Sequence, residues 1–406
     1  MAFDPEEAKR RRERRQAHRK QQKRKKRLLW AGAALALCVM IVLIIVGVSS
    51  CERQPNNPSQ AGNETTPPTT VIHLAALGDL NVTQTVTNSG GVKRDYTETF
   101  MDVAHLLADA DITLVNFEGN LYGEPYGTDR SAPQSLAQAM KSAGIDLVQL
   151  ANSYAIYKGM DGLSATITGF RNAGIEPVGV QTPTAKNNGY TIRTVDGIKI
   201  AFVAFTKGMD GMALPTGYEN SVNVLYKDYS STYQEVDTEG ITAVLNRVAK
   251  EKPDLTVALL HWGSEFNDTI SKTQDKICTL MQENGVDAII GTHSHYLQKM
   301  VLDQEAGTFV AYSLGDFTGD AARSGSEYSV VLDLEISKNT ETGETKVTGF
   351  SYTPIFTVVE PGKPLRVVRI HEAIAAYEAG YLDRVSQETY EAMKYALTRI
   401  EARIHG

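Results

Sequence analysis

Cysteine is scarce in this sequence: the 406 residues contain only Cys38, Cys51 and Cys278. Three thiols spaced in this way cannot form the set of several disulfides that stabilises small secreted domains. With 42% hydrophobic and 22% charged residues, the composition is that of a globular protein with ample material for a core. A folded domain in this chain must therefore rely on its own apolar core, which suits a bacterial surface protein.

Charge is absent from residues 28–48, a run of 21 largely apolar positions. A helix of that length can cross a hydrocarbon core of about 30 Å. Residues 1–27, directly before the run, hold 13 Lys and Arg against 4 Asp and Glu, a net charge of +9. The positive-inside rule places this tail in the cytoplasm and the main domain outside the cell membrane. Because topology explains the basic run, we expect no nucleic-acid binding.

The apolar segment has two possible fates. It is longer than the hydrophobic region of most signal peptides, which favours a single retained transmembrane anchor over residues 28–50. The small residues Ser49 and Ser50 before Cys51 instead resemble a lipoprotein cleavage site. Either outcome leaves the rest of the chain tethered to the membrane.

Residues 51–70 combine four prolines with Asn, Ser, Thr and Gln. Such a segment cannot bury enough apolar surface to fold, so we expect a disordered linker. A folded domain is predicted at residues 71–360 and a C-terminal helical extension at residues 361–406.

The chain beyond the basic tail is acidic. Of the 41 basic and 48 acidic residues, residues 28–406 keep 28 and 44, a net charge of −16. A polyanion would be repelled at long range and would need a bound metal or a local cationic patch to dock. Candidates for such a patch are Lys186, Arg193, Lys199 and Lys207.

From residue 71 onward, short apolar runs alternate with segments of helical spacing. Strands are predicted at residues 71–77, 112–115, 146–150, 176–180, 190–194, 199–205, 255–260, 287–290, 309–314, 328–336 and 345–359. Helices are predicted at residues 97–110, 133–143, 162–173, 238–251, 271–284 and 384–404. The turn Asp196-Gly197 predicts a hairpin, and residues 209–231 a long loop. This order indicates a layered α/β domain with a largely parallel sheet and an antiparallel extension.

Polar residues follow six of the predicted strands within a few positions. They are Asp79, Glu118, Asn152, His261, His293 and Asp316. Ligands of parallel α/β sheets bind outside the carboxyl ends of the strands. The shared position of these residues therefore predicts one site.

Three of the eight histidines, His261, His293 and His295, lie just past apolar runs. A single histidine is more often structural, but imidazole is the commonest neutral metal ligand. In extended backbone, His293 and His295 would point the same way, toward one ion or a close pair. Imidazoles mixed with carboxylates suit Mn²⁺, Fe²⁺ or Zn²⁺, and one or two ions are expected.

Other residues near these positions have two interpretations each. Asp79 alone could be an ordinary turn residue, and Glu118 a loop carboxylate or helix cap. Glu265 could orient the His261 imidazole or face solvent. Trp262 is expected to pack over the site, and Gln298 to line it.

Several motifs occur here in the order found in CapA-type proteins, the poly-γ-glutamate capsule biosynthesis proteins related to calcineurin-like metallophosphatases. The resemblance covers residues 71–317. The motifs are Gly78-Asp79, Asn116-Phe117-Glu118, Ala151-Asn152, His261-Trp262-Gly263-Ser264-Glu265, Gly291-Thr292-His293-Ser294-His295 and Tyr312-Ser313-Leu314-Gly315-Asp316-Phe317. The resemblance implies a four-layer metallophosphatase-like αββα sandwich.

The chemistry of these residues and the resemblance together lead us to expect the following roles in the site. The metal ligands would be Asp79, Glu118, His261, His293 and His295. Catalytic roles would fall to His261, Glu265 and Asn152. Substrate contacts would come from Tyr154, Trp262, Gln298 and Asp316.

The sequence departs from the family pattern after Ala151-Asn152, where the family continues with Asn-His. Here Ser153 and Tyr154 follow, so a phenol replaces the histidine that acts as general acid in related phosphatases. A phenol has a reference pKa near 10, and losing general acid catalysis costs about 10²–10⁴-fold. Asp316 also stands where the family more often has Asn.

Together these features predict a membrane-anchored extracellular CapA-like protein. It would act in poly-γ-glutamate capsule synthesis, export or anchoring, with a metal site of reduced activity. Its partners would be poly-γ-glutamate or a related anionic polymer and membrane capsule-synthesis subunits. The alternatives are a metal-dependent surface phosphatase or phosphodiesterase and a non-catalytic polymer-binding module.

Overall fold

The computed structural model describes residues 68–182, 189–319, 323–381 and 385–405. The predicted basic tail, the transmembrane anchor and most of the linker lie outside these ranges. No helix in the described ranges has the length and apolar character needed to cross a bilayer. The anchor therefore stays a sequence-based prediction.

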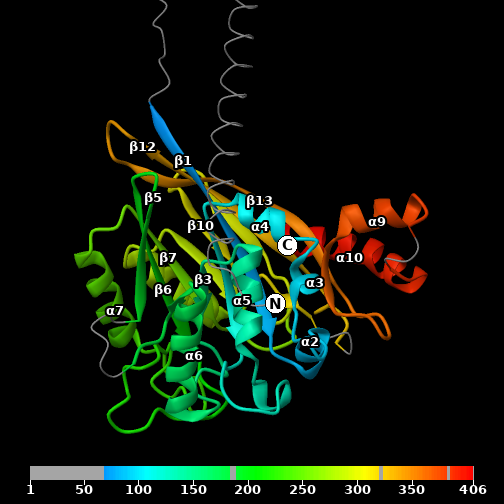
Figure 1. Cartoon of the computed structure of the whole chain (residues 1–406). Coiled ribbons are helices and arrows are strands. Elements are labelled where there is room, and N and C mark those ends of the chain that lie inside the picture. The colour runs from blue at the N-terminus through cyan, green and yellow to red at the C-terminus, as the bar shows by residue number, and fades with distance from the viewer. Residues whose placement is uncertain (1–67, 183–188, 320–322, 382–384, 406) are drawn as a thin grey trace, which may run out of the picture. The chain divides into compact units, whose positions relative to one another are not determined.

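The first sheet has eight strands in the order β14-β13-β12-β1-β2-β3-β4, with β11 beside β1. Figure 1 labels β1, β3, β12 and β13 of this sheet. β1 to β4 and β11 are parallel, and β12 to β14 extend the sheet in antiparallel fashion. The bounds are β1 (Thr69–Asn81), β2 (Ile112–Glu118), β3 (Leu147–Gln149), β4 (Glu176–Val178), β11 (Asp316–Thr318), β12 (Tyr328–Asn339), β13 (Thr345–Val358) and β14 (Arg366–Arg369).

The second sheet has six strands in the order β5-β6-β7-β8-β10-β9. β6, β7, β8 and β10 are parallel, and the edge strands β5 and β9 are antiparallel. The bounds are β5 (Tyr190–Val195), β6 (Ile198–Thr206), β7 (Leu255–His261), β8 (Ala288–Thr292), β9 (Met300–Asp303) and β10 (Thr308–Ala311). The predicted mixture of parallel and antiparallel strands is confirmed, divided over two sheets.

Side-chain alternation along β6 shows how the layers pack. Phe202 and Ala204 join the apolar cluster of the first sheet, whereas Val203 and Phe205 join the cluster that contains α7 (Thr238–Lys250) and α8 (Lys272–Glu283). The two sheets therefore face each other, and α7 and α8 cover the outer face of the second.

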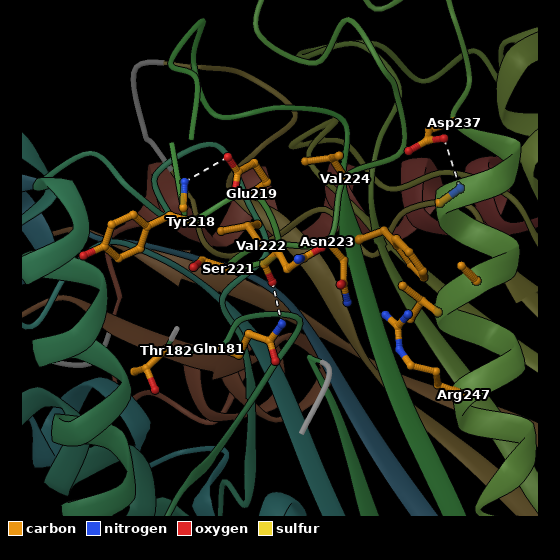
Figure 2. Close-up of a pocket in the computed structure, with 16 residues that line it drawn as sticks. Gln181, Thr182, Tyr218, Glu219, Ser221, Val222, Asn223, Val224, Asp237 and Arg247 are labelled. Carbon is orange, nitrogen blue, oxygen red and sulfur yellow. Dashed lines mark hydrogen bonds between the residues drawn. The ribbon is translucent and has the colours of Figure 1, made fainter. Parts of the chain in front are cut away.

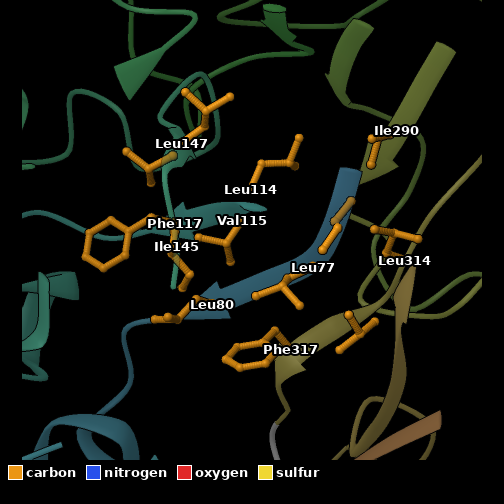
Figure 3. Close-up of a cluster of buried hydrophobic side chains, with 14 of the residues drawn as sticks. Leu77, Leu80, Leu114, Val115, Phe117, Ile145, Leu147, Ile290, Leu314 and Phe317 are labelled. Carbon is orange, nitrogen blue, oxygen red and sulfur yellow. The ribbon is translucent and has the colours of Figure 1, made fainter. Parts of the chain in front are cut away.

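The core between the sheets lies next to β1. Figure 3 shows Leu77 of β1 and Leu114 of β2 in one cluster with Ile290 of β8. Helices α4 (Ala104–Asp109), α5 (Gln134–Ala143) and α6 (Gly159–Ala173) join this cluster through their buried residues. The α6 residue Phe170 packs edge-on against Phe117 of β2, with 4.8 Å between ring centroids. Two facing mixed sheets with helices packed against them confirm the predicted α/β fold class.

Capping residues mark where several of the helices begin and end. Gly144 and Gly174 end α5 and α6 in the left-handed conformation that favours glycine. Ser271 begins α8 with a capping box to Gln274. The single helix predicted over residues 97–110 is wrong, because α3 (Thr97–Phe100) and α4 are separate.

Several short elements were not predicted. They are α2 (Gln84–Ser89), the 3₁₀ turn η1 (Thr128–Arg130), β9, β11, β14 and α9 (Ile370–Glu378). Most of them are too short to show a hydrophobic period.

Residues 361–406 contain β14 and α9 as well as α10 (Gln387–His405). β14 pairs with β13 at the edge of the first sheet. Met393, Ala396 and Ile400 lie on one face of α10 and are buried in the main core. This segment therefore shares the core of the first sheet.

The β1 backbone is closest to its neighbours at Gly78. A Cβ atom at this position would lie 1.8 Å from the Gly315 carbonyl oxygen, which is backbone and cannot move aside freely. Gly78→Ala is expected to lower the free energy of unfolding by about 3 kcal/mol, measured by chemical denaturation. Gly349→Ala is the matched control, because its Cβ would meet nothing closer than 3.8 Å. Equal stability of the two variants would contradict this packing.

Candidate functional site

Six buried polar side chains meet at the carboxyl ends of the parallel strands. In the pairing of the first sheet, Asp79 of β1 lies between Asn116 of β2 and Asp316 of β11. The other members come from the ends of β2 and β7 and the segment after β8. The six are Asp79, Glu118, His261, His293, His295 and Asp316, each at most 8% exposed. The strand-end rule predicted the common location of five of them, and the spacing of the histidines added His295.

Glu118, His261 and His293 could hold a metal ion, because their donor atoms lie within 4.8 Å of one another, and we call them the first ligand set. Glu118 Oε1 lies 2.7 Å from His261 Nε2. The other ring nitrogen of His261, Nδ1, lies 3.2 Å from the Thr206 hydroxyl. The rings of His261 and His293 are 4.3 Å apart between centroids. The imidazole of His261 is thus held from both sides.

The second ligand set consists of Asp79, His295 and Asp316, again within 4.8 Å of one another. His295 Nδ1 lies 2.8 Å from Asp316 Oδ1 and 3.8 Å from Asp79 Oδ2. The Phe266 ring stacks on His295 with 4.9 Å between centroids. This imidazole is therefore fixed between two carboxylates and covered by an aromatic ring.

Asp79 links the two sets. Its Oδ2 accepts a hydrogen bond from the His293 backbone amide at 3.1 Å, and its Oδ1 accepts one from Asn116 Nδ2 at 2.6 Å. Asn152 in turn donates to Asn116 Oδ1 at 3.0 Å and to the Phe117 carbonyl at 2.7 Å. The amide of Asn152 therefore orients Asn116 behind the ligand sets.

The backbone at the two histidines is not extended. His293 has φ 89° and His295 φ 58°, values in the left-handed region that non-glycine residues rarely adopt. The prediction that both point the same way along a strand is wrong. Their ring centroids are 6.4 Å apart, and each belongs to a different ligand set. Such strain is typical of sites where geometry is imposed for function.

Burial and charge shift the pKa values of the carboxyl groups in opposite directions. Burial, with the charge of Glu118, raises the pKa of Asp79 well above its usual value. Burial also raises the pKa of Asp316, to about 6. For Glu118, burial acts in the same direction, but the hydrogen bond and charge of His261 lower its pKa to about 2.

The imidazoles also differ from one another. Burial lowers the pKa of His261 and lowers that of His293 well below the usual value. Burial would lower the pKa of His295 too, but Asp316 and the other carboxylates raise it to about 10. The first set thus presents neutral imidazoles, the form that binds a metal.

The donor set fits a divalent cation. His293 Nε2 is buried and has no hydrogen-bond partner in the part of the chain that the structure describes. Such an atom costs about 1–3 kcal/mol unless something binds it. Three buried carboxylates likewise need a compensating charge, and buried charges are paired or coordinate metals. Imidazole and carboxylate donors together match Mn²⁺, Fe²⁺ or Zn²⁺.

Two residues that were predicted to contact substrate lie elsewhere. Trp262 is fully buried in the cluster of α7 and α8, and its indole N–H donates to the Tyr312 carbonyl at 2.8 Å. As the neighbour of His261 along the chain, it points to the other face. Gln298 is 1% exposed and bonds the Asn267 carbonyl and the Gln274 amide. Neither side chain is accessible to a substrate.

Glu265 and Tyr154 lie outside the ligand sets. Glu265 is exposed, and both ring nitrogens of His261 have other partners, so Glu265 does not orient that imidazole. Tyr154 is half-buried, and its hydroxyl accepts a hydrogen bond from Arg130 at 2.8 Å. Burial raises the pKa of Tyr154.

Sequence reasoning missed three residues that shape the site. Asn116 and Thr206 also lie at strand ends, so the same rule could have included them. Arg130 lies in a loop without hydrophobic period, and nothing in its sequence neighbourhood distinguishes it. Asp316 was predicted to contact substrate, and the structure places it in the second ligand set.

The predicted cationic patch does not form as proposed. Lys199 lies at the start of β6 and Lys207 just past its end, so the length of the strand separates them. Arg193 pairs with Ile200 near the start of β6, and Lys186 lies outside the described residues. Of Arg193, Lys199 and Lys207, the three that the structure describes, Lys207 is the one whose charge acts on His261 and His293.

A pocket of 430 Å³ lies away from both ligand sets. It is formed between α7 and the loop at residues 217–224, and Figure 2 shows Arg247 of α7 and Asn223 among its lining residues. None of the six ligand residues lines it. The pocket is therefore not part of the candidate metal centre.

Residues 73–321 match the family described as "Bacterial capsule synthesis protein PGA_cap". The capsule biosynthesis protein CapA of Bacillus anthracis is 25% identical over 253 residues, which are 59% of this chain and 58% of that protein. The PGA biosynthesis protein CapA of Bacillus subtilis (strain 168) is 27% identical over 213 residues, 52% of each chain. The match thus spans between half and three-fifths of these relatives' length.

Solved structures show a weaker similarity. The calcineurin-like phosphoesterase YfkN of Bacillus subtilis has a TM-score of 0.44 and 18% identity, covering 82% of this chain and 98% of that chain. A 5'-nucleotidase of Staphylococcus aureus, described as putative, has a TM-score of 0.46 and 13% identity, covering 71% and 55%. Similarities of this size do not establish a shared activity.

Metal content tests the first ligand set directly. The full chain, loaded with Mn²⁺ or Zn²⁺ and freed of excess ion, is expected to retain metal by elemental analysis. His293→Ala should weaken metal affinity more than about 100-fold, because loss of even an outer-sphere partner costs about 10–100-fold. His73→Ala is the control, since His73 is half-exposed and bonds Asp333 at 3.0 Å. Equal metal content in the two variants would exclude His293 as a ligand.

Proposed function

Because the chain belongs to the PGA_cap family of bacterial capsule synthesis proteins, we propose that it acts in the synthesis, export or anchoring of poly-γ-glutamate or a related anionic capsule polymer. The matched residues 73–321 include both ligand sets. The relatives in the two Bacillus species bear names of capsule and PGA biosynthesis. The observation that carries a metal-dependent role is the unpartnered Nε2 of His293 beside Glu118 and His261.

The ligands for one or two divalent ions would be Asp79, Glu118, His261, His293, His295 and Asp316. When bound, such ions hold an anionic oxygen and lower the pKa of a coordinated water. The surrounding residues keep the donors in place: Thr206 fixes the His261 ring, and Asn116 fixes the Asp79 carboxylate. The Phe266 ring covers one face of the His295 imidazole.

The site lacks a good general acid for hydrolysis at the position of Tyr154. Tyr154 stands where related phosphatases have a histidine, and burial raises the pKa of its phenol. The phenol therefore keeps its proton at neutral pH and is a poor general acid. The poor general acid therefore favours a protein that binds and positions an anionic ligand. It disfavours the alternative function, a rapid phosphatase.

Residues 28–50 would anchor the protein, with the folded domain outside the membrane. The support for this proposal is the uncharged run that follows a tail of net charge +9. In this arrangement the domain would work beside membrane subunits of the capsule-synthesis machinery.

Complementation of a deletion strain tests the proposal. The wild-type gene is expected to restore cell-associated anionic polymer, and His293→Ala should leave it at the level of the deletion. His73→Ala should restore it fully. Full restoration by His293→Ala would show that the ligand set has no part in capsule formation.

Turnover of a chromogenic phosphoester distinguishes the proposed function from the alternative, a surface phosphatase. With a typical kcat of about 10 s⁻¹ reduced by about 10²–10⁴-fold, we expect turnover of the metal-loaded full chain no faster than about 0.1 s⁻¹. Faster turnover that a chelator abolishes would favour the surface phosphatase.

A further inference from the structure

We propose that Arg130 is the anion-binding residue of this site, receiving a phosphoryl or carboxylate oxygen of the ligand on its guanidinium. The inference rests on the proposed function, because it assigns the substrate class that the centre takes. Carboxylate and phosphoryl groups each carry two or more negatively charged oxygens. The planar guanidinium can donate two parallel hydrogen bonds to a pair of these oxygens.

The backbone holds Arg130 next to the end of β2. The Arg130 carbonyl accepts a hydrogen bond from the Asn120 amide at 2.7 Å, and Asn120 forms a parallel bridge with Ser131. Ala132 donates to the Asn120 carbonyl at 2.8 Å. Asn120 lies two residues past Glu118, so the loop that carries Arg130 is fixed to the strand that supplies a metal ligand.

Tyr154 holds the guanidinium. Arg130 Nη2 donates to the Tyr154 hydroxyl at 2.8 Å, and Arg130 Cζ lies 4.2 Å from the centroid of the Tyr154 ring. Tyr154 is itself fixed at both backbone groups: its amide donates to Asn152 Oδ1 at 3.0 Å and its carbonyl accepts from Asn120 Nδ2 at 3.1 Å. The residue that replaces the family's histidine thus positions a cation.

One donor group of the Arg130 guanidinium is without a hydrogen-bond partner among the described residues. Arg130 Nη1 is buried and has no hydrogen-bond partner among the described residues, and Arg130 makes no ion pair with a carboxylate there. A buried donor left in this way costs about 1–3 kcal/mol. The backbone is also strained, with φ 51° at Asp129 and φ 57° at Arg130. An arriving oxyanion would satisfy the donor and the charge together.

The charge of Arg130 also acts on Glu118 of the first ligand set, where it is one of the smaller causes of the lowered pKa. Lys207 adds a second cation, with Nζ donating to the Gly263 carbonyl at 2.9 Å. Residues 28–406 carry a net charge of −16, and three carboxylates are buried in the site. Arg130 and Lys207, together with a bound divalent ion, would offset this negative charge where an anion binds.

Anion binding to the full chain tests the assignment. Inorganic phosphate and tri-γ-glutamate are titrated calorimetrically into the wild type, Arg130→Gln, Arg130→Lys and Arg94→Gln, each with and without Mn²⁺. Arg94 is the matched control: its φ is 52°, its Cζ lies 4.4 Å from the Tyr126 ring centroid, and its charge is paired with Glu124 at 3.1 Å.

Arg130→Gln is expected to weaken binding of at least one probe about 10–100-fold, the range of a charged hydrogen bond. Arg130→Lys should lie between this variant and the wild type, which keeps the test valid if the glutamine variant folds poorly. Arg94→Gln should bind as the wild type does. The probe whose affinity falls identifies the anion as phosphoryl or carboxylate.

The assignment is overturned if neither probe binds the wild type, if Arg130→Gln binds both unchanged, or if Arg94→Gln weakens binding equally. Metal content, measured in parallel, separates this result from the proposed function. A wild type that binds no metal contradicts the metal centre, whereas the Arg130 effect is still read from the titrations without Mn²⁺.

Discussion

The structure depends on three carboxylates that are buried together at the end of a parallel sheet. Asp79, Glu118 and Asp316 are at most 3% exposed, and burial of such groups is costly unless each has a hydrogen-bond donor or a cation. Three imidazoles, an asparagine and a backbone amide meet part of this need. The raised pKa of Asp79 shows that the need is not fully met. A divalent cation bound by these residues would supply the missing charge.

The topology explains why this cluster forms. β1 lies at the centre of the first sheet, between β2, β11 and β12, and its carboxyl end meets the loop after β8 of the second sheet. Residues more than 200 positions apart therefore contact one another, as in the bond from His293 to Asp79. Gly78 allows the close approach of β1 to Gly315 that brings Asp79 and Asp316 together.

Much of the fold could be predicted from the sequence, because strand and helix periods and caps such as Gly144 are local signals. The common location of most residues in the two sets could also be predicted, since they follow apolar strands. The left-handed backbone at His293 and His295 could not be predicted, because neither residue is a glycine, the usual sequence signal of that conformation. The prediction that Trp262 packs over the site is wrong. Side chains alternate between the two faces of β7, and because His261 faces the site, the next residue faces away from it. The position of Arg130 beside the end of β2 depends on the bridge between Asn120 and Ser131, which only the three-dimensional structure shows.

The most direct test of the metal centre is the position of the ion itself. Crystals of the full chain loaded with Mn²⁺ or Zn²⁺ would locate it by anomalous diffraction. The account predicts a peak bound by His293 Nε2, His261 and Glu118, with a second peak, where two ions bind, at Asp79, His295 and Asp316. A loaded crystal with no peak at these residues, or with the ion held elsewhere in the chain, would contradict it.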